Sequence, residues 1–375
     1  MDCSVEIRPS LGICKLQALV WNFQNGPITG EVDCSSSKLK IVVKENDAAT
    51  IQTELAFSDN VAFKADRLSV VQGHEVLRDR ERFAQPVPCR ELTFNMFCEK
   101  AEPEPKLQHL VESALVAGTQ YCFKCGSCFA EILDEDASFR RVLPLPSENW
   151  REAAGEWFCH KHESTTGSDI PRVLEPKSDE LFTSTTHVIV HNARVCGADL
   201  DRGDGRLRCA QCGVVLGRKA TDSSAALFTT RVTVTPVDEE DGNTVGGADA
   251  SSILRALIKE RLELNTTCRL VVTSGKQVLL LWLMETGLHH FHSKDVQSRQ
   301  VVVHLRVGSK LLYLKTDDSD AVVATWKQDP LVGEYQLEPE VMEDTVDYLN
   351  THCNTMGATF ERFRVIFLPG VVAQR

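Results

Sequence analysis

The cysteines of this chain are the residues whose type and spacing most directly predict chemistry. The chain has 375 residues and 14 cysteines, a number that would give roughly 0.5 Cys-x-x-Cys pairs by chance. Three such pairs occur: Cys122–Cys125, Cys125–Cys128 and Cys209–Cys212. The first and third share a frame, because YCFKCG and RCAQCG both end in glycine (Gly126 and Gly213). A glycine there lets the backbone turn so that its amides point toward the sulfurs, the knuckle geometry of thiolate-bound zinc.

Two such knuckles supply four thiolates, which satisfy a tetrahedral zinc ion without leaving an open coordination position. The sequence therefore predicts that Cys122, Cys125, Cys209 and Cys212 bind one Zn²⁺. The alternative is that these cysteines are buried free thiols. A redox role is less favoured, because neither pair opens a helix after a strand, the arrangement that lowers a thiol pKa.

Three further residues could extend the ligand set. Cys128, Cys159 and His160 could supply one more ligand, or form a second site together with His162. The competing interpretation is a buried thiol beside a surface imidazole, and the sequence leaves both open.

The stretch LPLPSENW, Leu143 to Trp150, lies between the two knuckles. Its two prolines hold the backbone extended, which lowers the entropy lost when such a loop meets a partner. The predicted partner-binding residues are Leu143, Leu145, Glu148, Asn149, Trp150 and Trp157. In the alternative, the loop folds back and both tryptophans cover the domain's own core.

The remaining sequence predicts a β-rich α+β protein of three domains. Short alternating runs such as KLKIVVK indicate strands, whereas linkers are marked by proline, glycine and charge. The expected organisation is an N-terminal β domain over 1–100, a linker over 101–118, a zinc-knuckle β domain over 119–237, an acidic and glycine-rich linker over 238–250, and a C-terminal α+β region over 251–375.

The C-terminal region carries the clearest element signals. SSILRALIKERLE and EPEVMEDTVDYLNTHC predict helices, the second with Pro339 in its first turn. RLVVTSGKQVLLLWLM and VVVHLRVGSKLLYLKT are each expected to form a strand, a turn at the Ser-Gly or Gly-Ser pair, and a second strand. FRVIFLP predicts a closing strand.

Composition narrows the classes of function. The formal net charge is −12 and the sequence pI is about 5.5, which argues against direct binding of nucleic acid. The longest apolar run, VLLLWLM, is too short to span a bilayer, and no basic and apolar leader is visible at the start. Many cysteines without a leader indicate a reducing compartment, so a cytoplasmic protein is expected, with the nucleus as a second location.

Four motifs together resemble the HECT-like ubiquitin-protein ligase family. They are YCxxCG, RVLPLPSENW, GEWxCH and CxxCxVxLG, and the resemblance covers roughly Tyr121 to Arg375. It implies the transfer of ubiquitin from a conjugating enzyme to protein substrates, whereas the widely spaced knuckles, the second running into Leu-Gly in CGVVLG, match the pattern of tent-like zinc domains. The implied partners are a ubiquitin-conjugating enzyme, ubiquitin, and a substrate such as cyclin B or the endonuclease of pre-mRNA 3′-end processing.

A ligase of the HECT type needs an exposed cysteine of lowered pKa that accepts ubiquitin as a thioester. Cys353, in THCN, is the weak candidate, and Cys268 is a weaker one. Met342, Val346, Leu349 and Cys353 form one helical stripe, however, so Cys353 is expected to face the core. The rival function is a non-catalytic binding module or chaperone that holds a client or bridges a conjugating enzyme to it.

Overall fold

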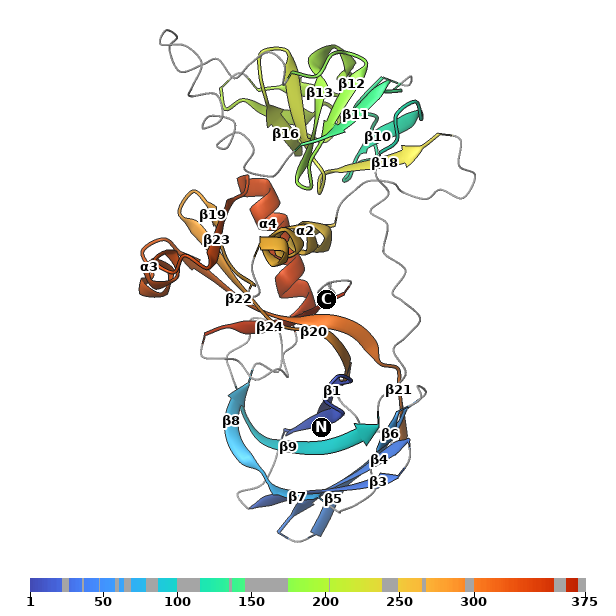
Figure 1. Ribbon diagram of the computed structural model, residues 1–375, viewed down its shortest axis with the longest axis vertical. Helices are drawn as coiled ribbons and strands as arrows, with labels where there is room; N and C mark the ends of the chain where they lie inside the picture. The colour runs from blue at the N-terminus through green and yellow to red at the C-terminus, as the bar shows by residue number, and fades with distance from the viewer. Residues whose placement is uncertain are drawn as a thin grey trace.

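A computed structural model gives the fold of the chain (Figure 1). The described residues are 1–21, 27–35, 37–46, 48–57, 61–63, 69–78, 87–99, 115–134, 137–145, 175–201, 203–237, 249–264, 268–293, 300–353 and 362–369. Strands dominate these residues and three α-helices accompany them, which confirms the predicted β-rich α+β class. Three bodies follow one another along the long axis: a strand-rich domain with the cysteine knuckles, a central α+β body, and a curved β body that contains the N-terminus.

The largest sheet joins strands from the two ends of the chain. Its strands are β1 (Asp2–Arg8), β2 (Ile13–Val20), β6 (Ala62–Phe63), β8 (His74–Arg78), β9 (Val87–Glu99), β19 (Cys268–Ser274), β20 (Gln277–Ser293), β22 (Arg306–Asp317), β23 (Val332–Gln336) and β24 (Arg364–Leu368). The main order is β23-β19-β20-β1-β2-β9-β6. β22 pairs with β20 and β24, and β8 pairs with β9. β1 therefore lies between β2 and β20, antiparallel to both.

A second sheet covers the apolar face of β1, β2 and β9. Its members are β3 (Ile28–Ser35), β4 (Lys38–Glu45), β5 (Ala48–Phe57), β7 (Ser69–Gln72) and β21 (Gln300–Val303), in the order β21-β5-β4-β3-β7. Alternate residues of β4 (Leu39, Ile41 and Val43) are buried between the sheets, as a half-buried strand requires. β21 also contributes Val303 to this core. Segments from the two ends of the chain thus share a sheet and a core, although the sequence predicts that they belong to separate domains.

The knuckle domain is a β structure of two sheets. A two-stranded sheet consists of β10 (Tyr121–Cys125) and β18 (Val232–Pro236). The other sheet, in the order β11-β12-β13-β17-β16-β15-β14, consists of β11 (Arg141–Pro144), β12 (Glu180–Thr183), β13 (His187–His191), β14 (Ala198–Leu200), β15 (Arg206–Cys209), β16 (Val215–Lys219) and β17 (Ser224–Phe228). A short 3₁₀ turn covers Asn192–Arg194. Buried residues such as Phe123 and Phe139, whose rings meet edge to face at 6.2 Å, fill the space between the sheets.

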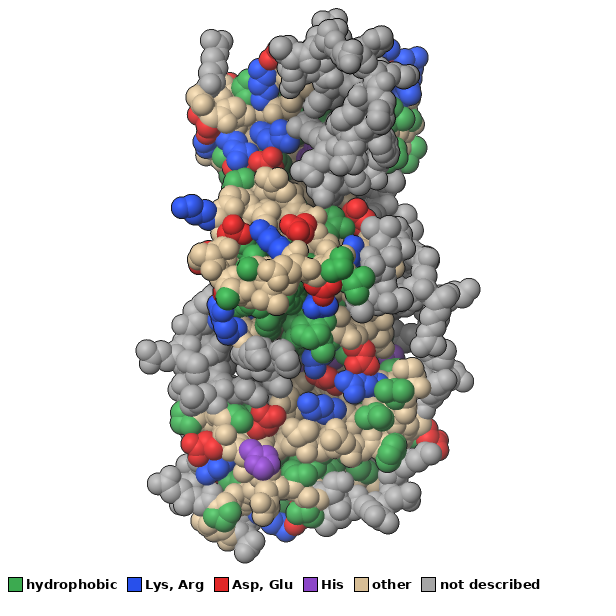
Figure 2. All heavy atoms as spheres, turned by 60° about the vertical axis from the view of Figure 1, so that its left-hand side comes forward, with side chains coloured by type: hydrophobic (Ala, Val, Ile, Leu, Met, Phe, Trp, Pro, Cys, Tyr) green, Lys and Arg blue, Asp and Glu red, His purple; other side chains and the backbone are tan. Residues whose placement is uncertain are grey.

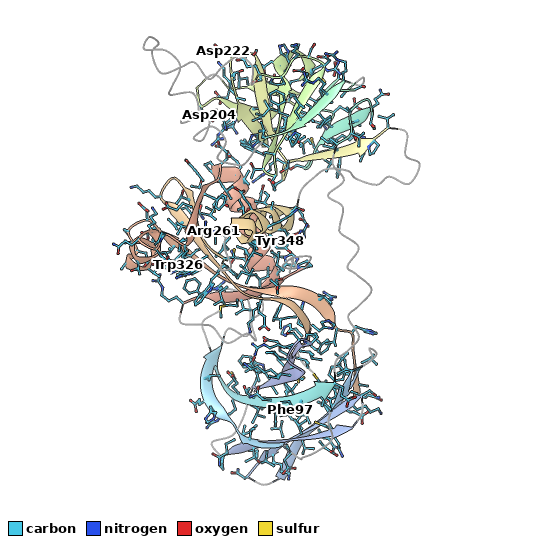
Figure 3. The ribbon with its side chains drawn as sticks, viewed as in Figure 1. Phe97, Asp204, Asp222, Arg261, Trp326 and Tyr348 are labelled. Carbon is cyan, nitrogen blue, oxygen red and sulfur yellow. The ribbon has the colours of Figure 1, made fainter. Side chains whose placement is uncertain are left out.

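Helices cover both faces of the C-terminal part of the large sheet. α2 (Ala250–Leu264) and α4 (Pro339–His352) pack on one face, and α3 (Ala321–Lys327) covers the other with Trp326 (Figures 1 and 3). Both long helices were predicted from their apolar stripes. The Asp249 carboxylate accepts the Ser252 N–H at the start of α2.

The two predicted hairpins of this region have different outcomes. β19 and β20 form the first, with Gly275 at φ +58° in its turn, so that prediction is confirmed. The second prediction is wrong, because β22 continues through Gly308 and Ser309 without a turn. A Cβ atom at Gly308 would lie 3.2 Å from the His290 ring and 3.3 Å from the Leu368 carbonyl oxygen. This glycine therefore permits a close approach between neighbouring strands.

Ion pairs join the knuckle domain to the N-terminal half of α4. Arg231 contacts both carboxylate oxygens of Asp344, at 2.8 Å from Nε and 2.7 Å from Nη2, and the Thr230 hydroxyl donates to the same group. Arg206 and Arg218 contact the carboxylate of Glu338 at 3.1 and 2.6 Å. Arginines of the knuckle domain therefore hold this helix.

On the face in Figure 2, basic and acidic side chains are interspersed over the described part of the molecule. Among the described residues, the structure contains no helix that is both long enough and apolar enough to cross a membrane.

Candidate metal centre

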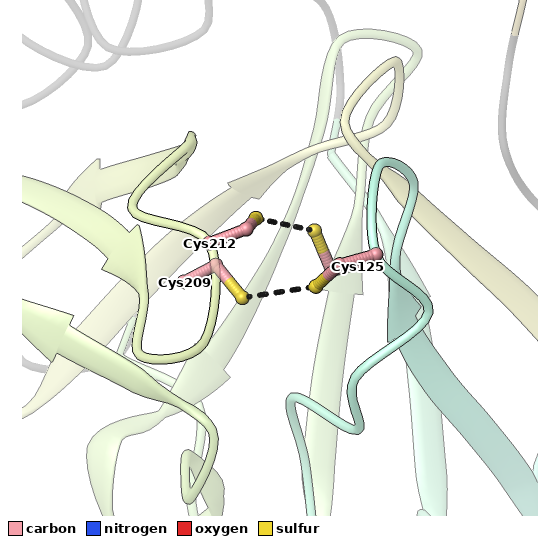
Figure 4. A group of neighbouring side chains, drawn as sticks. Cys125, Cys209 and Cys212 are labelled. Atoms are coloured by element: carbon pink, nitrogen blue, oxygen red, sulfur yellow. Dashed lines mark hydrogen bonds between the residues drawn. The ribbon is translucent and has the colours of Figure 1, made fainter.

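Four cysteine sulfurs meet where the two knuckles face each other. The Sγ atoms of Cys125, Cys128, Cys209 and Cys212 all lie within 4.8 Å of one another. The Cys125 and Cys212 sulfurs are 3.7 Å apart, and the Cys128 and Cys209 sulfurs are 3.6 Å apart (Figure 4). This set could hold a metal ion, with two ligands from each knuckle.

Local chain geometry explains how each knuckle presents its sulfurs. Cys125 is the last residue of β10 and Cys209 is the last residue of β15, and a turn after each strand brings the next cysteine back. The Ser127 N–H donates to the Cys125 sulfur at 3.4 Å, as expected of a knuckle that stabilises a thiolate. The two knuckles are far apart in sequence but meet in space, because β10 and β15 lie in two facing sheets. β10 belongs to the sheet that it forms with β18, and β15 belongs to the other sheet.

The predicted ligand set needs one correction: Cys128 is a member of the cluster and Cys122 is not. Side chains alternate along β10, so Tyr121, Phe123 and Cys125 point into the domain while Cys122 points to the other face. The Cys122 sulfur lies 3.9 Å from a carboxylate oxygen of Glu131. The first knuckle is therefore CGSC, one Cys-x-x-Cys step further along the chain than the sequence suggested.

Electrostatics within the cluster favour a bound cation. Burial opposes ionisation of Cys209, but hydrogen bonds from the Cys212 and Gln211 amides and from the sulfurs of Cys128 and Cys212 lower its pKa to about 7. For Cys128, the Ala130 amide favours the thiolate, yet burial and the three neighbouring sulfurs outweigh it and raise the pKa to about 12. Four thiols cannot all ionise at this separation alone, whereas a metal ion stabilises all four thiolates.

Among the described residues, no further side chain joins these four cysteines. Cys159 and His160 lie outside the described residues. Cys196 is exposed near the second knuckle, but its sulfur lies 3.6 Å from the Ile132 carbonyl oxygen rather than in the cluster.

The predicted partner-binding loop is described only at its start. Leu143 and Leu145 are half-buried against Phe182, Ile189 and Ala226 of their own domain. Two of the expected apolar anchors thus pack partly against their own domain. The others, Glu148, Asn149, Trp150 and Trp157, lie outside the described residues.

Cys353 directly follows α4 and is half-buried against the core cluster that contains Leu349 and Tyr313. The predicted stripe therefore holds, because Met342, Val346 and Leu349 are buried on the same face. Cys268 is buried, and burial raises its pKa to about 12. Cys268 is therefore shielded from solvent, and Cys353 is only partly exposed.

The chain matches a known protein family over most of its length. A sequence model of the family described as "HECT-like Ubiquitin-conjugating enzyme (E2)-binding" matches residues 6–361. A mouse protein named as an E3 ubiquitin-protein ligase is 27% identical over 192 residues, 50% of each chain. The rat protein of the same name is 27% identical over 189 residues, 50% of this chain and 49% of its own.

The match with these relatives is partial, since the chain spans about half the length of the curated relatives it matches. No solved structure matches. The family match nevertheless covers nearly the whole chain and both cysteine knuckles. The chain belongs to the family of HECT-like, ubiquitin-conjugating-enzyme (E2)-binding proteins.

Proposed function

We propose that this protein is a ubiquitin-protein ligase that binds a ubiquitin-charged conjugating enzyme and promotes direct transfer of ubiquitin to a protein substrate. Binding of the conjugating enzyme follows from the family. Ubiquitin and the substrate are the further partners of the proposal. Cyclin B and the 3′-end processing nuclease remain predictions from the resemblance.

The environment of the described cysteines supports direct transfer rather than a thioester on this chain. A ubiquitin-accepting thiol must be exposed and have a lowered pKa. Outside the four-cysteine cluster, six described cysteines have a raised pKa, with burial as the main cause: Cys3, Cys14, Cys34, Cys98, Cys196 and Cys268. Cys353 is half-buried rather than exposed.

Reconstitution with a charged conjugating enzyme tests the route of transfer. We expect ubiquitinated product without a thiol-sensitive ubiquitin adduct on this chain in a non-reducing gel. Cys353→Ala should retain most of the transfer. Cys159→Ala applies the same test to the cysteine that lies outside the described residues. An adduct that disappears in either variant would establish a thioester route instead. Binding without any transfer would favour the non-catalytic bridging role.

We also propose that the metal of the four-cysteine cluster is Zn²⁺ in a structural role. Zinc–sulfur bonds of about 2.3 Å place the corners of a tetrahedron about 3.8 Å apart. The sulfur pairs at 3.6 and 3.7 Å come close to that separation. Four thiolates leave no open coordination position, so the ion would stabilise the domain rather than activate a water molecule. Elemental analysis of the purified protein tests this, and a protein without zinc would exclude it.

A further inference from the structure

The two knuckles have the same backbone but different residues at one position. In the first, the Cys125 N–H donates to the Ala130 carbonyl at 2.8 Å and the Phe129 N–H donates to the Cys125 carbonyl at 2.9 Å. In the second, the equivalent bonds join Cys209 to Val214 and Gly213 to Cys209, both at 2.9 Å. Phe129 therefore occupies the position that Gly213 occupies in the other knuckle.

This position requires left-handed backbone. The φ angle is +61° at Phe129 and +73° at Gly213. Glycine adopts this conformation without steric cost, whereas a bulky aromatic residue there is a true outlier. The second knuckle thus shows that glycine suits this position. By comparison, the first knuckle carries an aromatic side chain on a strained backbone.

Packing within the protein does not explain why the ring is kept. Phe129 is 66% exposed, although its neighbours Cys125 and Ile132 are fully buried. Strained residues that persist without packing occur preferentially at functional sites. The strain therefore indicates that the Phe129 ring is used outside the fold.

The surroundings of the ring form a small rigid surface, which we call the knuckle tip: residues 126–129 and 210–213. Its two loops lie close together, because the sulfurs of Cys125 and Cys128 are 3.7 and 3.6 Å from those of Cys212 and Cys209. Ser127, Ala210 and Gln211 are exposed beside the ring, and the tip contains no Lys, Arg, Asp or Glu. An exposed aromatic side chain on a rigid, weakly polar surface has the character of a binding hot spot, because little entropy is lost when it enters a partner's pocket.

We propose that the knuckle tip is the docking surface for the ubiquitin-conjugating enzyme, with Phe129 as its apolar anchor. This inference rests on the proposed function, and the conjugating enzyme is the one partner that the family description supplies. Since the tip lacks charged side chains, the affinity should derive from apolar burial. The contribution of Phe129 should therefore change little with salt concentration.

The decisive variant is Phe129→Gly, which removes the ring and the backbone strain together. We expect it to melt at or above the wild-type temperature and to bind the conjugating enzyme at least about tenfold more weakly. Phe129→Ala should lose the same affinity while it keeps the strain. Phe97→Ala is the matched control, because Phe97 is an equally exposed aromatic residue (68%) on β9 of the N-terminal β body (Figure 3). It should bind like wild type.

Binding is measured by calorimetry against a panel of purified conjugating enzymes, each free and as a stable ubiquitin conjugate. If wild type binds none of them, the proposed function fails. If wild type binds and Phe129→Gly binds equally well, the docking surface is wrong while the proposed function stands. A Phe129→Gly variant that loses its zinc or melts early would show that the ring has a structural role, and this would also overturn the inference.

Discussion

Acidification should weaken the large sheet at one identifiable side chain, His290 of β20. Its ring stacks on Phe367 with centroids 4.2 Å apart, in the layer where β20 pairs with β1. Burial, followed by the Arg306 guanidinium and the neighbouring His292 and His289, lowers its pKa to about 4, although the Glu6 carboxylate acts in the opposite direction. The unfolded chain should bind a proton at an ordinary pKa of 6.5.

The sign and size of the effect follow from linkage. Because the folded-state pKa is depressed, the contribution of the neutral imidazole is fully present above pH 6.5 and is lost as the pH falls toward 4. The two pKa values correspond to about 2 kcal/mol of unfolding free energy lost between about pH 7.5 and pH 5, and to about 3 kcal/mol near pH 4.

His290→Gln isolates this term, since glutamine is neutral at every pH. Loss of the stacked ring should lower the variant's stability by about 1 kcal/mol at neutral pH. Removal of the proton-linked loss should make it more stable than wild type below about pH 5.5. Urea denaturation of both proteins between neutral pH and about pH 5 measures the difference in their unfolding free energies. Acid effects that both proteins share cancel in this difference.

An exposed histidine of the same sheet provides the control. His74→Gln on β8 should keep the wild-type acid response. If the stability of His290→Gln falls with pH as steeply as that of wild type, His290 does not carry the acid sensitivity and the reasoning is refuted.

Three further substitutions test the metal centre and its connection to α4. Cys128→Ser should fail to retain the proposed zinc and melt early, whereas Cys122→Ser should match the zinc content of wild type. Elemental analysis after gel filtration decides, and the reverse outcome would restore the ligand set expected from sequence. Asp344→Ala should lower the unfolding free energy by about 2 kcal/mol, because it leaves Arg231 without its main charged acceptor. Asp344 and Arg231 are about a fifth exposed (23% and 21%), so water partly screens the pair. The estimate is therefore taken from the lower part of the range for a buried charged group that loses its partner. A urea midpoint equal to that of wild type would contradict the prediction.

Local patterns in the sequence predicted the elements that depend on local physics. The stripes of α2 and α4, Pro339 in the first turn of α4, and the β19–β20 hairpin each follow from periodicity or turn chemistry within a few residues. The presence of two cysteine knuckles was predictable for the same reason, because a knuckle is a short-range motif.

Choices that depend on register or on distant partners were not predictable from sequence. YCFKC and CGSC overlap at Cys125, and only the alternation of β10 decides that Cys122 faces away. A glycine after the second cysteine favoured the wrong frame, since the position that needs left-handed backbone is occupied by Phe129. Gly308 likewise suggested a turn, whereas its role becomes visible only beside His290 and Leu368 of neighbouring strands.

The pairing of β1 with β20 has a consequence for how the protein is made and dissected. β1 leaves the ribosome long before β20, its second neighbour in the sheet. At a synthesis rate of about 5 to 20 residues per second, β20 is complete at Ser293 about 15 to 60 s later. During that interval β1 presents an open edge that can pair with other chains. The knuckle domain is in topological terms an insertion into one discontinuous unit. Truncation at either predicted linker would thus expose a strand edge, whereas excision of the insertion would leave the large sheet complete.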